Sequence, residues 1–143
     1  MAHPRQLIRD NIVTTLTSLT TTGANVFRSR VYPLTADRMP GLAIYTRDET
    51  SEYTTMGPSR TVLRTVTVTV EVYVAANADY DTTIDTSCEE VENALAVDRT
   101  RGGLALDTRV VSLNVDFAGE SETPVARATV QIEVDYVTIE GSA

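Results

Sequence analysis

The chain of 143 residues contains no lysine and no tryptophan, and it has one cysteine and one histidine. A single cysteine, Cys88, excludes an internal disulfide framework and a zinc site built from several cysteines. Without lysine the phosphate-binding motif G-x-x-x-x-G-K-[ST] is impossible, and G-x-G-x-x-G is also missing. No apolar run approaches the roughly 18–20 residues of a membrane span, and residues 1–10 have no apolar signal-peptide core. We therefore expect a protein that folds in a reducing cytoplasm and has no membrane partner.

The sequence also has few groups that could carry out chemistry. Ser-His-Asp and Cys-His schemes would both depend on His3, which we expect to lie in a mobile N-terminus. Cys88 lies on the apolar stripe of a predicted helix, beside Glu89 and Glu90, which favours a buried thiol over a reactive thiolate. The acidic residues within 79–95 enclose no glycine of the kind that a calcium-binding loop requires. We predict that the protein is not an enzyme and has no catalytic residue, metal ligand or cofactor.

The charge of the chain makes nucleic acid a poor candidate partner. The net charge is −8 and the isoelectric point is about 4.5, so the surface as a whole repels nucleic-acid phosphates. All 12 basic residues are arginines. Two explanations of this bias remain open: a GC-rich coding genome, or protein interfaces, where arginine is favoured over lysine.

Two stretches have the spacing of amphipathic helices. The first begins at Pro4, which suits the first helical position, and we expect it to stop at Gly23 because threonines weaken its far end. Its apolar stripe consists of Ile8, Ile12, Leu16 and Leu19. The second helix covers residues 80–95, and its apolar stripe consists of Tyr80, Ile84, Cys88, Val91 and Leu95.

Five stretches are predicted to be strands: residues 26–32, 42–47, 60–74, 111–117 and 126–135. In the clearest of them, 60–74, valines alternate with threonines and other polar residues, which is the pattern of a strand with one buried face. The same alternation in 111–117 and 126–134 predicts a buried apolar face for each. The polar stretch 48–59 is expected to form an extended loop or arm, and 99–103 and 118–124 are expected to be turns.

This order of elements predicts a single α+β domain, residues 1–143. It consists of a mostly antiparallel mixed sheet, two helices packed on one face of the sheet, and a long projecting hairpin or arm. A strand covering residues 60–75 would be roughly 50 Å long, whereas a compact domain of this size is roughly 37 Å across. Such a strand must either bend or project, and a projecting hairpin needs a partner for its edge.

Three places in the sequence are predicted to form an interface. The arm carries a tyrosine and a methionine, types that are enriched at interfaces. Two arginines lie on the outer face of the strand 26–32, and the turn 99–103 adds two more. The predicted interface residues are Glu49, Glu52, Tyr53, Met56, Arg28, Arg30, Arg99 and Arg101.

Two N-terminal segments match longer patterns. Residues 23–34, GANVFRSRVYPL, follow the predicted helix and fit G-x-x-V-F-x-S-R-x-Y-P-L, and residues 39–46, MPGLAIYT, fit L-P-x-L-x-V-Y-T. The long Val-Thr strand and the acidic helix follow in the same order. In these features, which cover most of the chain, the sequence resembles the tail-terminator proteins of long-tailed bacteriophages.

The resemblance implies a function in assembly. Proteins of this family share the general fold of the tail-tube subunit and form a ring, commonly a hexamer, at the head-proximal end of the finished tail tube. The ring ends tube polymerisation and provides the surface for head–tail joining, and DNA passes through its lumen. By this resemblance the chain is a virion protein of the tail or neck, assembled in the bacterial host cytoplasm. Its partners would be further copies of itself, the tail-tube protein and the head–tail connector protein, and head-to-tail contacts would close the ring.

Two alternatives remain open. The chain could be another neck, connector or minor tail ring protein, which only its binding partner would distinguish from a terminator. A different class is a small peptide- or ligand-binding module, which would need an apolar pocket with convergent polar groups.

Overall fold

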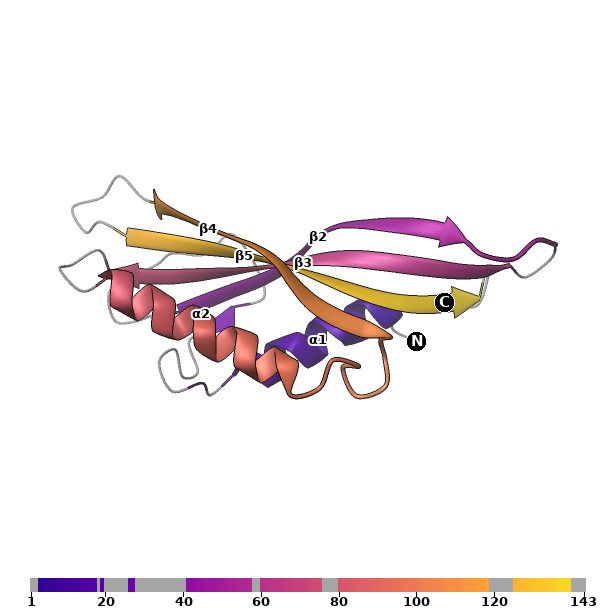
Figure 1. Ribbon diagram of the computed structural model, residues 1–143, viewed down its shortest axis with the longest axis horizontal. Helices are drawn as coiled ribbons and strands as arrows, with labels where there is room; N and C mark the ends of the chain where they lie inside the picture. Colours follow the sequence, from indigo (N-terminus) through magenta and orange to yellow (C-terminus); the bar gives the residue numbers. More distant parts are fainter. Residues whose placement is uncertain are drawn as a thin grey trace.

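The computed structural model of the chain describes residues 3–17, 19, 26–27, 41–57, 60–75, 80–118 and 125–139. The elements are, in order, α1 (Pro4–Leu16), β1 (Val26–Phe27), β2 (Gly41–Tyr53), β3 (Thr61–Ala75), α2 (Tyr80–Ala96), β4 (Asp107–Ala118) and β5 (Val125–Ile139). All the strands belong to one sheet, and both helices lie on the same side of it (Figure 1). The predicted α+β class is confirmed.

The strands lie side by side in the order β1-β2-β3-β5-β4. The short β1 is parallel to β2, and every other neighbouring pair is antiparallel, so the predicted mostly antiparallel mixed sheet is also confirmed. β3 pairs with β5 over its whole length, from Thr61 opposite Ile139 to Ala75 opposite Val125. β3 and β5 therefore form the centre of the sheet, and β4 forms one of its two edges.

The core lies between the sheet and the helices. The valines of β3 that the alternation assigned to one face, at positions 62, 66, 68, 70, 72 and 74, are all buried. β5 presents alanines, valines and an isoleucine to the same layer, and its Val130, Ile132 and Val134 are fully buried. Removing such a side chain from water stabilises the folded state by about 1.5–3 kcal/mol. This layer holds both helices against the sheet.

Helix α1 follows the predicted stripe but ends early. Pro4 is at its start, and the side chains of Ile8, Ile12 and Leu16 are fully buried. The helix stops at Leu16 because Thr17 has an extended backbone and its hydroxyl donates to the carbonyl oxygen of Val13 at 2.6 Å. The expected stop at Gly23 is therefore wrong, since β-branched threonine disfavours the helix sooner.

The fourth residue of the predicted stripe, Leu19, is not helical. It follows the end of α1 and packs, partly buried, against the core. Four residues of the predicted α2 stripe, Ile84, Cys88, Val91 and Leu95, are buried, while Asp81 and Glu89 stand on the exposed side. The side chain of Tyr80, the first residue of that stripe, lies outside the described part of the structure.

Strand β2 is longer than predicted, and residues 48–53 are part of it. The prediction of a loop beginning at residue 48 is wrong, because these residues pair with β3 from Asp48 opposite Thr67 to Tyr53 opposite Val62. Pairing with a long neighbour satisfies the backbone groups of this polar segment, so the segment needs no apolar face of its own. A bulge lies at Arg47, between the paired residues Thr46 and Asp48.

The connection from β2 to β3 covers residues 54–60, and hydrogen bonds tie its described part to the start of β3. The backbone N–H of Thr54 donates to the carbonyl oxygen of Thr61 at 3.0 Å, and the Thr61 N–H donates to the Thr55 hydroxyl at 2.8 Å. Gly57 has φ of 93°, a conformation that side chains disfavour. Of the predicted strand 26–32, residues 26–27 form β1 and the remainder lies outside the described residues.

A substitution in the core tests the packing of α1 against the sheet. Ile12→Ala removes a fully buried side chain of α1, and we expect the free energy of unfolding to fall by about 2–5 kcal/mol, because the cavity adds to the lost burial. Leu7→Ala is the matched control on the exposed side of the same helix, with an expected change within about 0.5 kcal/mol. Urea denaturation followed by circular dichroism measures both, and equal losses would contradict the position of α1.

Candidate functional site

A cluster of polar side chains joins the start of α1 to the sheet. Its central residue is Glu49 of β2, whose side chain is only 12% exposed. One carboxylate oxygen of Glu49 accepts from Arg5 of α1 at 2.8 Å and from Arg64 of β3 at 3.2 Å, and the other accepts from the Tyr136 hydroxyl. Arg64 also donates to the Thr138 hydroxyl at 2.9 Å. The contacts of Glu49 therefore lie within one molecule.

His3 belongs to the same region. Its Nδ1 accepts from the backbone N–H of Arg5 at 3.0 Å, which caps the first turn of α1, and its ring stands edge-on to the ring of Tyr136. The expectation of a mobile His3 is therefore wrong. Burial, with Arg5 nearby, lowers the pKa of His3, and burial together with Glu49 raises the pKa of Tyr136. The neutral forms of His3 and Tyr136 are therefore favoured. The contacts of this cluster hold the start of α1 against the sheet.

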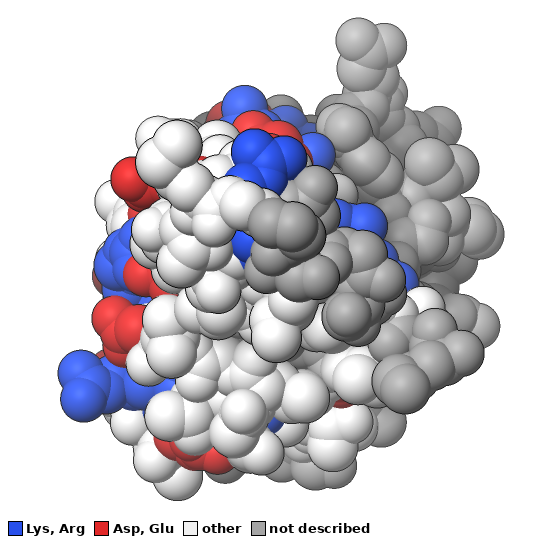
Figure 2. Space-filling model, turned by 90° about the vertical axis from the view of Figure 1, so that its right-hand side faces the viewer, with Lys and Arg blue, Asp and Glu red and all other residues white. Residues whose placement is uncertain are grey.

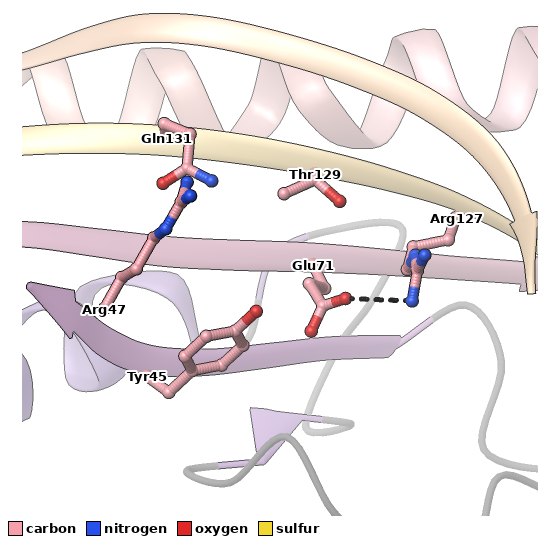
Figure 3. Close-up of a pocket in the computed structure, with 6 residues that line it drawn as sticks. All are labelled: Tyr45, Arg47, Glu71, Arg127, Thr129 and Gln131. Carbon is pink, nitrogen blue, oxygen red and sulfur yellow. Dashed lines mark ion pairs between the residues drawn. The ribbon is translucent and has the colours of Figure 1, made fainter.

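A second polar site lies on the face of the sheet opposite to the helices. It is a hollow of about 290 Å³, lined by side chains of β2, β3 and β5 (Figure 3). The lining residues are Tyr45, Arg47, Glu71, Arg127, Thr129 and Gln131. No prediction from sequence identified this site, because its residues come from three strands and carry no shared motif.

Glu71 and Arg127 hold one side of the hollow. The carboxylate of Glu71 is buried, accepts from the Tyr73 hydroxyl at 3.1 Å and lies 3.5 Å from the guanidinium of Arg127. Arg127 also forms two hydrogen bonds with Asp116, at 2.7 and 3.0 Å. These bonds lower the pKa of Asp116, and burial together with Glu71 raises the pKa of Tyr73 to about 12. The charges of Arg127 and Glu71 are thus already compensated.

Arg47 stands on the other side of the hollow and is differently placed. It extends from the bulge of β2 across the sheet towards Gln131 of β5 (Figure 3). Its guanidinium makes no hydrogen bond or ion pair with the described residues. The Gln131 amide oxygen accepts from the Thr69 hydroxyl at 2.9 Å. The hollow can therefore bind a polar or anionic group, but its walls are polar, unlike the apolar pocket expected of a small-molecule site.

The turn after α2 is built around a buried arginine. Arg101 donates to the carbonyl oxygens of Leu95 and Asp98, and it lies 3.4 Å from the amide oxygen of Asn11. It thereby satisfies carbonyl groups at the end of α2 that have no partner within the helix. Gly102 and Gly103 follow with positive φ, and so does Arg101 itself. The residue is 1% exposed, so the prediction that Arg101 offers a side chain at an interface is wrong for this fold.

The edge strand β4 carries an exposed apolar row. Val111, Leu113 and Val115 are 43–48% exposed, although the alternation of the sequence predicted a buried face for them. The strand is at the edge of the sheet, so this row has a neighbouring strand on one side only. Leu104 and Leu106, in the connection before β4, are exposed as well. We call these five residues the β4 flank.

A second apolar surface lies where the β2–β3 turn meets the end of β5. It consists of Tyr53, Met56, Val137 and Ile139, which we call the hairpin end. Met56, at the tip, is 97% exposed. The guanidinium of Arg60 lies 4.3 Å from the centre of the Tyr53 ring, a cation–π contact that fixes the ring beside the turn.

The predicted interface residues therefore fall into three groups. Glu52, Tyr53, Met56 and Arg99 are exposed, so their predicted role stays possible. Glu49 and Arg101 are bonded to other residues of the same chain, Glu49 to Arg5 and Arg64 and Arg101 to backbone carbonyls. Arg28 and Arg30 lie outside the described residues.

The remaining kinds of site are a metal site and a membrane-spanning helix. Among the described residues there is no group of His, Cys, Asp and Glu side chains placed to hold a metal ion. No helix in the described part of the chain is long and apolar enough to cross a membrane. Comparison with known proteins gives no relative: no protein-family model and no curated protein matches the sequence.

The Glu49 cluster yields a stability test with a control on the same strand. Glu49→Gln removes the charge that two arginines share, and we expect a loss of about 1–3 kcal/mol in the free energy of unfolding, because Arg5 and Arg64 lose their partner. Glu52→Gln, three residues away in an exposed position, should change it by less than about 0.5 kcal/mol. Equal effects in denaturation curves would show that Glu49 has no special role.

Cys88 gives a test of burial. Burial in α2, with Glu92 and Asp85 nearby, raises the pKa of the Cys88 thiol to about 11. At pH 8 only about one thiol in a thousand is then ionised, and its access is blocked as well. We expect Ellman's reagent to modify the folded protein far more slowly than the protein unfolded in urea, and the rate to rise as the pH increases towards 11. Equal rates in the two states at pH 8 would contradict the buried position.

Proposed function

We propose that the protein is a structural subunit of a phage tail, which forms a ring at the head-proximal end of the tail tube. The ring would end tube polymerisation and offer a surface for head–tail joining, as the resemblance of residues 23–34 and 39–46 to tail terminators implies. Its partners are further copies of itself, the tail-tube protein and the head–tail connector protein. The acidic chain would let DNA pass through the lumen without binding it.

The observation that carries this proposal is the pair of exposed apolar surfaces. Uncovered strand edges and apolar patches promote association with other chains. A row of valine and leucine along an edge strand is therefore typical of a surface that binds another protein. The β4 flank and the hairpin end are different surfaces at different places on the molecule (Figure 1). Contact between two different surfaces is heterologous, and such contacts build a ring when the rotation between neighbouring copies closes.

A ligand-binding module is the second candidate, and Arg47 is the observation in its favour. A guanidinium that has no ion pair among the described residues, at the rim of a hollow, could hold a carboxylate of a peptide. The two functions make different demands on this residue. Arg47→Ala should leave ring formation and tube capping unchanged if the protein is a terminator, whereas it should abolish binding in a module that uses this hollow.

Tube capping tests the main proposal. The protein is added to polymerising tubes of the cognate tail-tube protein, and tube lengths are measured by electron microscopy. We expect capped tubes of limited length with the wild type. Tyr53→Ser combined with Met56→Ser should leave a folded monomer that fails to cap, because the hairpin end loses its apolar surface while the β2–β3 pairing stays intact.

Two controls make this result specific. Leu7→Ser changes an exposed apolar residue on α1 that belongs to neither surface, and should cap normally. A deletion of residues 52–56 is a stronger perturbation, since it also shortens the paired part of β2, and it should fail to cap as well. Normal capping by both the double variant and the deletion would remove the hairpin end from the mechanism. Tubes that grow unchanged in the presence of the wild type would overturn the terminator proposal itself.

A further inference from the structure

We propose that the hairpin end of one copy docks on the β4 flank of the next copy, with Glu52 of the first beside Arg99 of the second. This inference rests on the proposed function, because it specifies the contact between subunits of the ring. It assigns a donor surface, an acceptor surface and a charge pair that fixes their register.

The donor surface is apolar at its centre. Tyr53, Met56, Val137 and Ile139 are all more than 45% exposed. Seen from the end of the molecule that carries the hairpin, the middle of the described surface is uncharged, and most charged side chains lie towards its margin (Figure 2). An apolar centre with a polar rim is the usual arrangement of a protein–protein interface.

The acceptor surface is formed by the connection from α2 to β4 and by β4 itself. Leu104 and Leu106 precede the strand, and Leu106 already belongs to the ladder, because its N–H donates to the carbonyl oxygen of Asp135 at 2.7 Å. Val111, Leu113 and Val115 continue the apolar surface along the strand. Val97, 86% exposed at the start of the connection, lies beside Arg99 in the sequence.

Charge complementarity selects a second copy as the occupant. Glu52 is exposed next to Tyr53 and makes no hydrogen bond or ion pair with the described residues, whereas Glu49 on the same strand is compensated by Arg5 and Arg64. Arg99 has a side chain 72% exposed, and its only ion pair among the described residues is a 3.9 Å contact with Asp107. Each surface therefore has a charge whose partner the other surface can supply.

The geometry favours a head-to-tail contact over pairing of two β4 edges. Leu113 lies opposite Val130 of β5, about 30 Å along the strand from Ile139, whereas the near end of the flank, Leu106, lies beside Asp135. A copy that donates its hairpin end still has its β4 flank free for the next copy. Pairing of β4 with β4 would bury the flank of both copies and stop at a dimer.

Charge reversal tests the contact. Glu52→Arg places an arginine against Arg99, and Arg99→Glu places a glutamate against Glu52, so each single variant should associate at least about tenfold more weakly than the wild type. The double variant restores opposite charges within one chain. An equimolar mixture of the two single variants restores them between chains, since each copy then meets only the other kind. We expect both to associate within about threefold of the wild type.

Sedimentation velocity over a range of protein concentration measures these associations, and circular dichroism checks that every variant is folded. Assembly of the wild type that neither reversal weakens would overturn this contact and leave the proposed function standing. Dimers that resist both reversals but are lost in Leu113→Glu would replace it with β4–β4 pairing. A wild type that stays monomeric at every concentration would overturn the contact, and failure to cap tubes as well would overturn the proposed function.

Discussion

The pairing of β3 with β5 is the interaction on which the rest of the fold depends. The two strands match residue for residue from one end of the sheet to the other, and each supplies buried apolar side chains to the helix side, from Val66 to Val74 on β3 and from Ala126 to Val134 on β5. β2 is added to the free edge of β3, and β4 to the free edge of β5. Because the centre is so long, the outer strands cannot all be covered by two helices, and the exposed surfaces of the molecule follow from that mismatch.

The same pairing determines which polar residues become structural. Glu49 stands opposite Val66 on the helix side of the sheet, where Arg64 interrupts the valines of β3 and the start of α1 brings Arg5 against it. Arg64 and Tyr136 stand opposite each other on β3 and β5 and complete its surroundings. The charge of Glu49 is tolerated there because each of its oxygens has a donor. A similar rule explains Arg101, which is buried but bonded to backbone carbonyls at the end of α2.

The periodicity of apolar residues was sufficient to predict which side chains are buried where the local sequence pattern alone determines the structure. The valines of β3, the stripe of α2 and the first three apolar residues of α1 all lie where the sequence placed them. Periodicity was insufficient where the structure of a segment depends on the strand beside it. Residues 48–53 have the composition of a loop, yet pairing with β3 makes them a strand, and Val111, Leu113 and Val115 have the alternation of a buried strand, yet a place at the edge leaves them exposed. Exposure of Glu52, Tyr53, Met56 and Arg99 was foreseen, whereas the hollow beside Arg47 needed the strand order.

The central claim is that this subunit assembles through two different surfaces, and the molar mass of the wild type in solution tests it most directly. Light scattering over a range of concentration and salt, with negative-stain imaging of the same samples, measures both the number of copies and the closure of the assembly. We expect a discrete species near six copies, the number that the resemblance implies, with a central hole, because heterologous contacts form a ring when their rotation closes. A monomer at every concentration, or a dimer that grows no further, would contradict it.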